Sequence, residues 1–172
     1  MIGPGGGDDA TSSSASKRRR RPEPSPTQRA LGLLTRREHS RRELARKLVQ
    51  RGVEVGDANA TIDKLAEAGW QDDARFAESL VRSRACSGYG PAFIKAELGT
   101  HGLGSEAIAG AMDGFDGDWV EVAAGLLRRR HPPASFEDRD AWRKAMDFLL
   151  RRGFGMEQAR AAWAVAKGEC GS

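Results

Sequence analysis

Three short stretches of this chain share one pattern: KLVQRGV at residues 47–53, ELGTHGL at 97–103 and LLRRGF at 149–154. In each, a polar or basic stretch runs into a glycine, and a bulky apolar residue follows that glycine at once. The glycines, Gly52, Gly102 and Gly153, stand 50 and 51 residues apart. Repetition at such a period indicates one supersecondary unit that is used three times.

Apolar residues recur at fixed distances from these glycines. They stand eight and four positions before each glycine and one, six and ten positions after it: Leu44, Leu48, Val53, Ala58 and Ile62; Ile94, Leu98, Leu103, Ile108 and Met112; Ala145, Leu149, Phe154, Ala159 and Trp163. Spacings of four are typical of one helix face, and glycine followed by an apolar residue often ends a helix in the left-handed conformation. Each unit is therefore predicted to contain a helix, a tight turn and a second helix.

The composition predicts an all-α fold. Ala, Leu, Glu, Arg and Lys dominate the body of the chain, and no stretch alternates apolar and polar residues as a half-buried strand does. We expect nine helices in three tandem three-helix repeats of helix-turn-helix type. The expected repeats span residues 27–70, 71–116 and 117–168.

Local signals predict where several helices begin. Ser40 with Glu43 three residues later is a capping box for the middle helix of the first repeat, and its third helix is expected to follow Asp57. Asp72 is predicted to cap the helix that opens the second repeat. Pro91 suits the first turn of the next helix.

The positive charge is modest and partly concentrated at one end. The chain carries 28 Lys and Arg against 24 Asp and Glu, a net charge of +4. Residues 1–26 hold five cations, all within 17–21, against three acids, 5 − 3 = +2, which leaves +2 for the body. This Gly-, Ser-, Pro- and Arg-rich segment is predicted to be a disordered basic arm, either a phosphate-binding or a solubilising one. The body would have to segregate its charges to attract nucleic acid.

No motif typical of an enzyme, a cofactor site or a metal site occurs in the chain. A GxxxxGK[ST] phosphate loop is absent, and His39, His101 and His131 lack the spacing of metal ligands. We expect neither catalysis nor a cofactor. Cys86 and Cys170 show no CxxC spacing, and no N-terminal apolar stretch resembles a signal peptide or a membrane span. We therefore expect a reduced, cytoplasmic protein without a membrane partner.

Helical periodicity places seven cations opposite the apolar stripes of their helices. These candidate contacts for a partner protein or DNA are Arg42, Arg46, Lys47, Arg75, Arg82, Lys144 and Arg151. In the first repeat, Val49 is expected in the buried stripe and Glu43 at the surface among the cations. An ordinary solvated surface of mixed charge is the alternative interpretation. Trp142 and Trp163 are expected in the core and not as base-stacking platforms.

GWQDDARFAESLV at residues 69–81 resembles the signature of the RecX family, bacterial regulators of the RecA recombinase. SGYGPAFIKAEL at 87–98 is similar to the family segment that follows, and Ser40, Glu43 and Leu44 with Gly52 are similar to the family's first repeat. The resemblance covers residues 27–168, strongly in the first two repeats and weakly in the third. Trp70 stands where the family has an aromatic residue, commonly tyrosine, and the basic extension lies outside the shared pattern. The signature positions are Gly69, Trp70, Asp72, Asp73, Phe76, Gly90 and Leu98.

The resemblance implies a non-catalytic regulator shaped as an elongated, curved array of three helical repeats. Such a protein binds RecA, lies in the groove of its filament on single-stranded DNA, and inhibits recombinase, ATPase and coprotease activities in DNA repair and the SOS response. Its DNA contacts are expected to be mainly sequence-independent. Asp72 and Asp73 are expected to fix the junction between the first two repeats. We expect a monomer, and an exchange of repeats between two copies would give a swapped dimer.

Two other functions fit the sequence pattern. A stand-alone helix-turn-helix regulator would bind DNA sequence-specifically in the major groove without RecA. A helical-repeat adaptor would bind protein alone and would show no affinity for DNA even at low salt.

Overall fold

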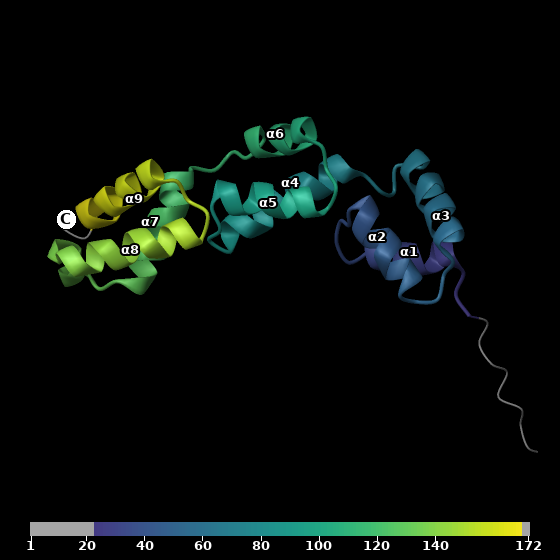
Figure 1. The fold of residues 1–172 in the computed structure, drawn as a ribbon, viewed down its shortest axis with the longest axis horizontal. Coiled ribbons are helices and arrows are strands. Elements are labelled where there is room, and N and C mark those ends of the chain that lie inside the picture. Colours follow the sequence, from purple (N-terminus) through teal and green to yellow (C-terminus); the bar gives the residue numbers. More distant parts are fainter. Residues whose placement is uncertain (1–22, 170–172) are drawn as a thin grey trace, which may run out of the picture.

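The computed structural model of the chain describes residues 23–169, without the side chains of Pro133, Ala134 and Glu169. Over this range the protein has nine α-helices, one 3-10 turn and no strand. The helices form three groups in an elongated, gently curved row, and the described chain begins in one end group and finishes in the other (Figure 1). The predicted all-α array of three tandem three-helix repeats is confirmed.

Each repeat consists of three short helices. The first contains α1 (Pro26–Leu34), α2 (Arg41–Val49) and α3 (Val55–Glu67). The second contains α4 (Asp73–Cys86), α5 (Pro91–Thr100) and α6 (Ser105–Asp113). The third contains α7 (Trp119–Arg130), the 3-10 turn η1 (Pro133–Glu137), α8 (Arg139–Arg151) and α9 (Met156–Glu169). Most of the predicted basic arm, residues 1–22, lies outside the described residues.

Polar side chains cap the first turns of five helices. The N-cap residues Ser25, Ser40, Asp72, Asp118 and Asp138 each accept a hydrogen bond from a backbone N–H inside the helix that they precede. These bonds satisfy donors that a helix start leaves unpaired. The predicted cap at Asp72 is confirmed.

Three local predictions in the first repeat are wrong. Helix α3 begins at Val55 after the N-cap Glu54, three residues before the start predicted to follow Asp57. Val49 is 41% exposed because α2 ends at this residue, so its side chain extends beyond the packed stripe. Glu43 is only 6% exposed, and its carboxylate binds Arg37 and Lys47, so only the Ser40 half of the predicted capping box forms.

The repeated apolar positions build a separate core in each repeat. Of the fifteen positions predicted from the glycine spacing, all are buried except Leu103 and Ile108, which are half-buried in the second repeat. Trp163 is buried in the third core and Trp142 packs against it half-buried, whereas Trp70 is 59% exposed. Because no core extends through the array, the relative placement of the repeats depends on the junctions between them.

The three repeat glycines end the middle helices in the left-handed conformation, as predicted. Their φ angles are 84° at Gly52, 82° at Gly102 and 87° at Gly153. The apolar residue after the glycine donates its N–H back into the helix in two repeats, from Val53 to Leu48 and from Phe154 to Leu149, both at 3.1 Å. The same turn therefore follows the middle helix in every repeat.

Adjacent repeats meet in a head-to-tail manner. His101, the C-cap of α5, contacts Ser40, the N-cap of α2, through Nδ1 and Oγ at 2.8 Å. Arg152, the C-cap of α8, accepts a hydrogen bond through its carbonyl from the N–H of Gly90, the N-cap of α5, at 2.7 Å. The end of each later middle helix thus lies against the start of the preceding one.

Candidate interaction surfaces

The junction between the first and second repeats, here called the first junction, is held by polar side chains. Asp73 Oδ1 accepts from the N–H of Arg41 at 2.8 Å, and Arg42 Nη1 donates to the carbonyl of Thr100 at 3.1 Å. Arg75 Nε donates to Glu38 at 3.0 Å, across the same boundary. Asp73 therefore joins two repeats, because its carboxylate binds the first turn of α2 from the first turn of α4.

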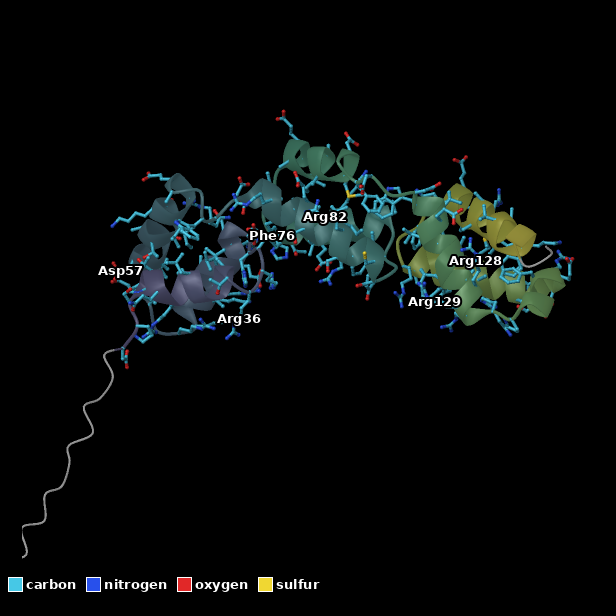
Figure 2. The ribbon with its side chains drawn as sticks, turned by 180° about the vertical axis from the view of Figure 1, so that it is seen from behind. Arg36, Asp57, Phe76, Arg82, Arg128 and Arg129 are labelled. Atoms are coloured by element: carbon cyan, nitrogen blue, oxygen red, sulfur yellow. The ribbon has the colours of Figure 1, made fainter. Side chains whose placement is uncertain are left out.

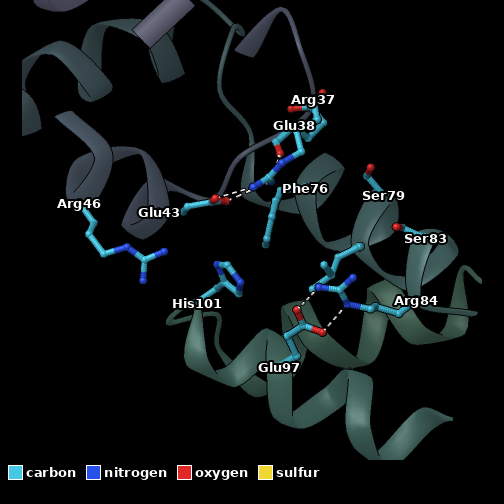
Figure 3. A pocket seen from close by; sticks show the side chains of 11 residues that line it. Arg37, Glu38, Glu43, Arg46, Phe76, Ser79, Ser83, Arg84, Glu97 and His101 are labelled. Atoms are coloured by element: carbon cyan, nitrogen blue, oxygen red, sulfur yellow. Dashed lines mark hydrogen bonds and ion pairs between the residues drawn. The ribbon is translucent and has the colours of Figure 1, made fainter. Parts of the chain in front are cut away.

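A pocket of about 440 Å³ lies at this junction (Figure 3). We call it the junction pocket; its lining residues are Arg37, Glu38, Glu43, Arg46, Phe76, Ser79, Leu80, Ser83, Arg84, Glu97 and His101. The close-up shows the pair of Arg37 with Glu43 on one side and the pair of Arg84 with Glu97 on the other. The lining carries three arginines and three glutamates, so the junction pocket offers both signs of charge and no net excess.

Glu43 is the buried centre of the charged network on the first repeat's side. Arg37 Nη1 donates to Oε2 at 3.1 Å, and Lys47 Nζ lies 2.9 Å from Oε1. Burial alone would raise the pKa of Glu43, but the hydrogen bonds from Arg37 and Lys47 outweigh burial and lower the pKa to about 2. Glu43 is therefore a carboxylate at any physiological pH.

His39 is held beside this network in one neutral form. Its Nδ1 lies 2.9 Å from the carbonyl of Arg37, which can only accept, so Nδ1 carries the proton. Nε2 then accepts from Lys47 Nζ at 3.0 Å. Burial lowers the pKa of His39, and the charges of Arg37 and Lys47 act in the same direction.

Arg84 and Glu97 form a bidentate pair on the second repeat's side. Two bonds of 2.6 Å join the guanidinium to the carboxylate. The hydrogen bond from Arg84 lowers the pKa of Glu97. Burial lowers the pKa of His101, which contacts Ser40 across the junction. Three arginines line the junction pocket, and Arg37 and Arg84 are paired with glutamates. Arg46 is the one of the three without a carboxylate partner in residues 23–169.

The structure divides the seven predicted cations into two groups. Arg42 and Arg75 bind across the first junction, and half-buried Lys47 binds Glu43 and His39. The second group, Arg46, Arg82, Lys144 and Arg151, is exposed and makes no hydrogen bond or ion pair across a junction within residues 23–169. Arg82 forms a surface pair with Glu78 at 3.7 Å, and Lys144 and Arg151 lie together in the third repeat.

Exposed arginines are spread along the array. Arg36, Arg82 and Arg129 belong to three different repeats (Figure 2). The residue counts show segregation by repeat: residues 27–70 carry nine cations and six anions, 71–116 four and seven, and 117–168 ten and seven. The net charges are therefore +3, −3 and +3. The basic repeats lie at the two ends, with an acidic one between them.

The signature residues serve several structural roles. Gly69 has a φ of 73° and ends α3, and Asp72 caps α4. Phe76 and Leu98 are buried in the second core. The remaining signature positions, Trp70, Asp73 and Gly90, lie at or beside junctions, where Arg75 Nη2 donates to the carbonyls of both Gly69 and Trp70.

Sequence reasoning missed the network that lines the junction pocket. Arg37, His39, Arg84 and Glu97 were not among the predicted site residues, and Glu43 was placed at the surface. The stretch from Arg36 to Glu43 contains seven charged or potentially charged residues among eight, and such a density of charge in the sequence is the signal of a polar junction. In the second repeat, Arg84 and Glu97 lie on different helices 13 positions apart, so their pairing required the structure.

The fold defines a class of protein: a tandem array of three helical modules joined end to end. No helix within residues 23–169 is long and apolar enough to cross a membrane. The same residues contain no group of three or more His, Cys, Asp or Glu side chains arranged to hold a metal ion.

Comparison with known proteins identifies the family. The models of the first, second and third three-helix domains of RecX match residues 27–65, 72–112 and 116–163. The regulatory protein RecX of Stenotrophomonas maltophilia (strain R551-3) is 61% identical over 140 residues, which cover 81% of this chain and 86% of that relative. The protein of the same name from Xanthomonas axonopodis pv. citri (strain 306) is 58% identical over the same share of each chain. The chain belongs to the RecX family.

Solved structures show the same fold. The crystal structure of RecX from Lactobacillus salivarius superposes with a TM-score of 0.67 at 23% identity, covering 82% of this chain and 94% of that one. A second crystal structure, of regulatory protein RecX, gives a TM-score of 0.64, covering 83% of this chain and 71% of that one. The three-repeat architecture is thus shared at low sequence identity.

Proposed function

We propose that this protein is a non-catalytic regulator that binds RecA and its filament on single-stranded DNA and inhibits the recombinase, ATPase and coprotease activities of RecA. The observation that carries this proposal is the match of all three repeats to RecX domains, together with 61% identity to a regulatory protein RecX. We place the protein in the cytoplasm, as a monomer whose repeat boundaries are 27–70, 71–116 and 117–168.

The arrangement of the repeats supports a partner with an extended groove. The cores are separate and the repeats lie in a row, so the protein presents a long surface instead of one concave site (Figure 1). Elongated repeat arrays commonly bind along their length. The end repeats carry net positive charge and suit DNA phosphates, whereas the acidic middle repeat suits a basic protein surface.

The junctions count against a stand-alone helix-turn-helix regulator. In such proteins the helix after the turn enters the major groove. The turn at Gly102 lies against Arg42, and the backbone of Gly153 lies against Phe93 and Gly90. Two of the three turns are therefore covered by the preceding repeat. A purely protein-binding adaptor is opposed by the basic end repeats, which would attract nucleic acid.

The proposal is tested by RecA-dependent ATP hydrolysis on single-stranded DNA with increasing amounts of this protein. Inhibition is expected, and charge reversal of the four exposed candidates, Arg46, Arg82, Lys144 and Arg151, to Glu should weaken it by at least about tenfold, because several charged contacts are lost together. The matched control reverses four exposed cations outside the candidate set, Lys64, Lys95, Arg139 and Arg160. No inhibition by the wild-type protein would overturn the proposed function, and equal weakening by both sets would overturn the assigned contact residues.

A further inference from the structure

A second pocket, of about 410 Å³, lies in the third repeat between the end of α7 and one face of α8. We call it the basic basin; its lining residues are Arg130, His131, Lys144, Asp147, Phe148 and Arg151. Three cations face one carboxylate. No ion pair within residues 23–169 neutralises Arg130, Lys144 or Arg151, in contrast to the paired arginines of the junction pocket.

The three repeats differ at one equivalent position of the middle helix. Lys47, Glu97 and Phe148 each stand five residues before the repeat glycine. In the first repeat Lys47 pairs with Glu43, and in the second Glu97 neutralises Arg84. The third repeat has an uncharged ring at this position.

Phe148 holds an arginine without neutralising it. The guanidinium of Arg130 lies over the ring, 4.6 Å from its centroid, and that of Arg152 lies at 5.3 Å. A stacked guanidinium keeps its charge and its in-plane N–H donors, which fit phosphate oxygens. His131 Nε2 is buried beside them and has no hydrogen-bond partner among the described residues.

The spacing of the exposed cations fits a chain of anions better than one ion. Lys144 and Arg151 are seven residues apart on α8, about 10 Å along the helix axis. Successive phosphates of a nucleic-acid strand are about 3.4 Å apart along a duplex axis, so this distance spans more than one of them. The open, unpaired charges also match the salt-dependent attraction that dominates binding to nucleic acids.

We infer that the basic basin is a binding site for the phosphodiester backbone of single-stranded nucleic acid, with Lys144 and Arg151 on separate, non-adjacent phosphates and Arg130, stacked on Phe148, between them. The inference deepens the proposed function, on which it rests for its setting in a DNA-containing filament. It assigns DNA contact to the third repeat and leaves the acidic second repeat for protein.

The test measures binding of a fluorescein-labelled thymidine 20-mer to the full chain by anisotropy over a range of NaCl concentrations, without RecA. The double variant Lys144→Gln/Arg151→Gln should lower the slope of log affinity against log salt by about 1.4, because each phosphate contact on a single strand contributes about 0.7. The control Arg139→Gln/Arg160→Gln removes the same charge from exposed positions of the same repeat, outside the basin. It should change the slope by less than half as much.

Equal loss in both variants would show a general charge effect and would overturn the inference, as would an unchanged slope in the basin variant or a wild-type protein that does not bind the oligonucleotide. The RecA ATPase assay and a pull-down of DNA-free RecA are run in parallel. If the basin variant keeps its DNA slope but loses binding to DNA-free RecA, the basin contacts an acidic protein surface and the inference is wrong. Failure of the wild-type protein to inhibit RecA would instead remove the proposed function while the DNA result stands.

Discussion

The two junctions of the array place their helices alike but use different chemistry. At the first junction, side chains make the contacts: Ser40 binds His101, and Asp73 binds the N–H of Arg41. At the second junction, between the second and third repeats, the backbone makes them. The N–H groups of Gly90 and Ala92 donate to the carbonyls of Arg152 and Gly153 at 2.7 and 3.0 Å.

This difference follows from how closely the chains approach. At the second junction a Cβ atom on Gly90 would lie 2.5 Å from the backbone of Gly153, so only glycine permits the contact. Arg152 adds a bond to the carbonyl of Ser87 and stacks over Tyr89. The first junction instead leaves the 440 Å³ junction pocket between its side chains. Backbone hydrogen bonds do not titrate, so the second junction should resist changes in pH. The first junction contains histidine and glutamate side chains and should respond to such changes.

Substitution of the repeat glycines should give the largest difference in unfolding free energy between the two junctions. Alanine at Gly153 would place a Cβ 2.4 Å from the backbone nitrogen of Phe93, in addition to a left-handed φ of 87°. We expect Gly153→Ala to reduce the free energy of unfolding by about 3 kcal/mol or more, from backbone strain plus overpacking.

Gly102→Ala and Gly52→Ala serve as the matched controls. Both have the same left-handed φ, but the added Cβ meets nothing closer than 3.6 Å at Gly102 and nothing within 4 Å at Gly52. Each should cost about 1 kcal/mol. Urea denaturation measures all three, and equal losses would show that the close approach at the second junction adds nothing.

Neutralising the buried carboxylate should be the next largest effect. Glu43→Gln removes the charge that Arg37 and Lys47 share, so we expect a loss of about 3 kcal/mol in unfolding free energy. Glu78→Gln, which removes the exposed partner of Arg82, is the control and should cost less than about 0.5 kcal/mol. A small, equal change in both variants would contradict the buried role of Glu43.

Acidification should weaken the first junction. The folded-state pKa of His39 lies below its ordinary 6.5, and that of Glu43 lies near 2 instead of 4.5. Because the unfolded chain binds these protons more readily, the stabilisation is present above pH 6.5 and is lost as pH falls, first through His39 and then, between pH 4.5 and 2, through Glu43.

Chemical denaturation at a series of pH values checks this dependence. His39→Gln should flatten the stability profile just below pH 6.5, although His101 and His131, whose pKa values burial also lowers, keep part of the slope. An unchanged profile in the His39 variant would exclude His39 as a source of the pH dependence.

The smallest expected effect concerns a single hydrogen bond across the first junction. Asp73→Asn weakens the acceptor for the N–H of Arg41, which should cost about 1 kcal/mol and speed hydrogen exchange of that amide. The amide of Gly90, bound to Arg152 at the second junction, is the internal control. Faster exchange at both amides would mean that the two junctions open together.

The repeat glycines made most of the fold predictable from the sequence. A glycine in a left-handed turn leaves a local signal, and the apolar spacing around it follows from helix geometry, so the repeat, the helix ends and nearly all core positions could be read directly. The misplaced Val49 and Asp57 lie at helix ends, where a shift of one or two residues changes exposure.

The candidate surfaces were less predictable because long-range pairing decides them. Periodicity correctly placed Arg46, Arg82, Lys144 and Arg151 at the surface. It could not show that Arg42 binds the carbonyl of Thr100, 58 residues away. Whether a cation is free depends on which carboxylate the fold brings beside it, and helical spacing within one repeat contains no such information.

The same backbone position is satisfied in two different ways in the first and third repeats. The carbonyls of Arg152 and Arg51 occupy the same place, one residue before the repeat glycine, and the first is bound by the N–H of Gly90 from the preceding repeat. No described repeat precedes Arg51, and its carbonyl accepts instead from the side chain of Arg29 in α1. One long side chain of the same repeat thus makes the contact that a backbone N–H of the neighbouring repeat makes at the second junction.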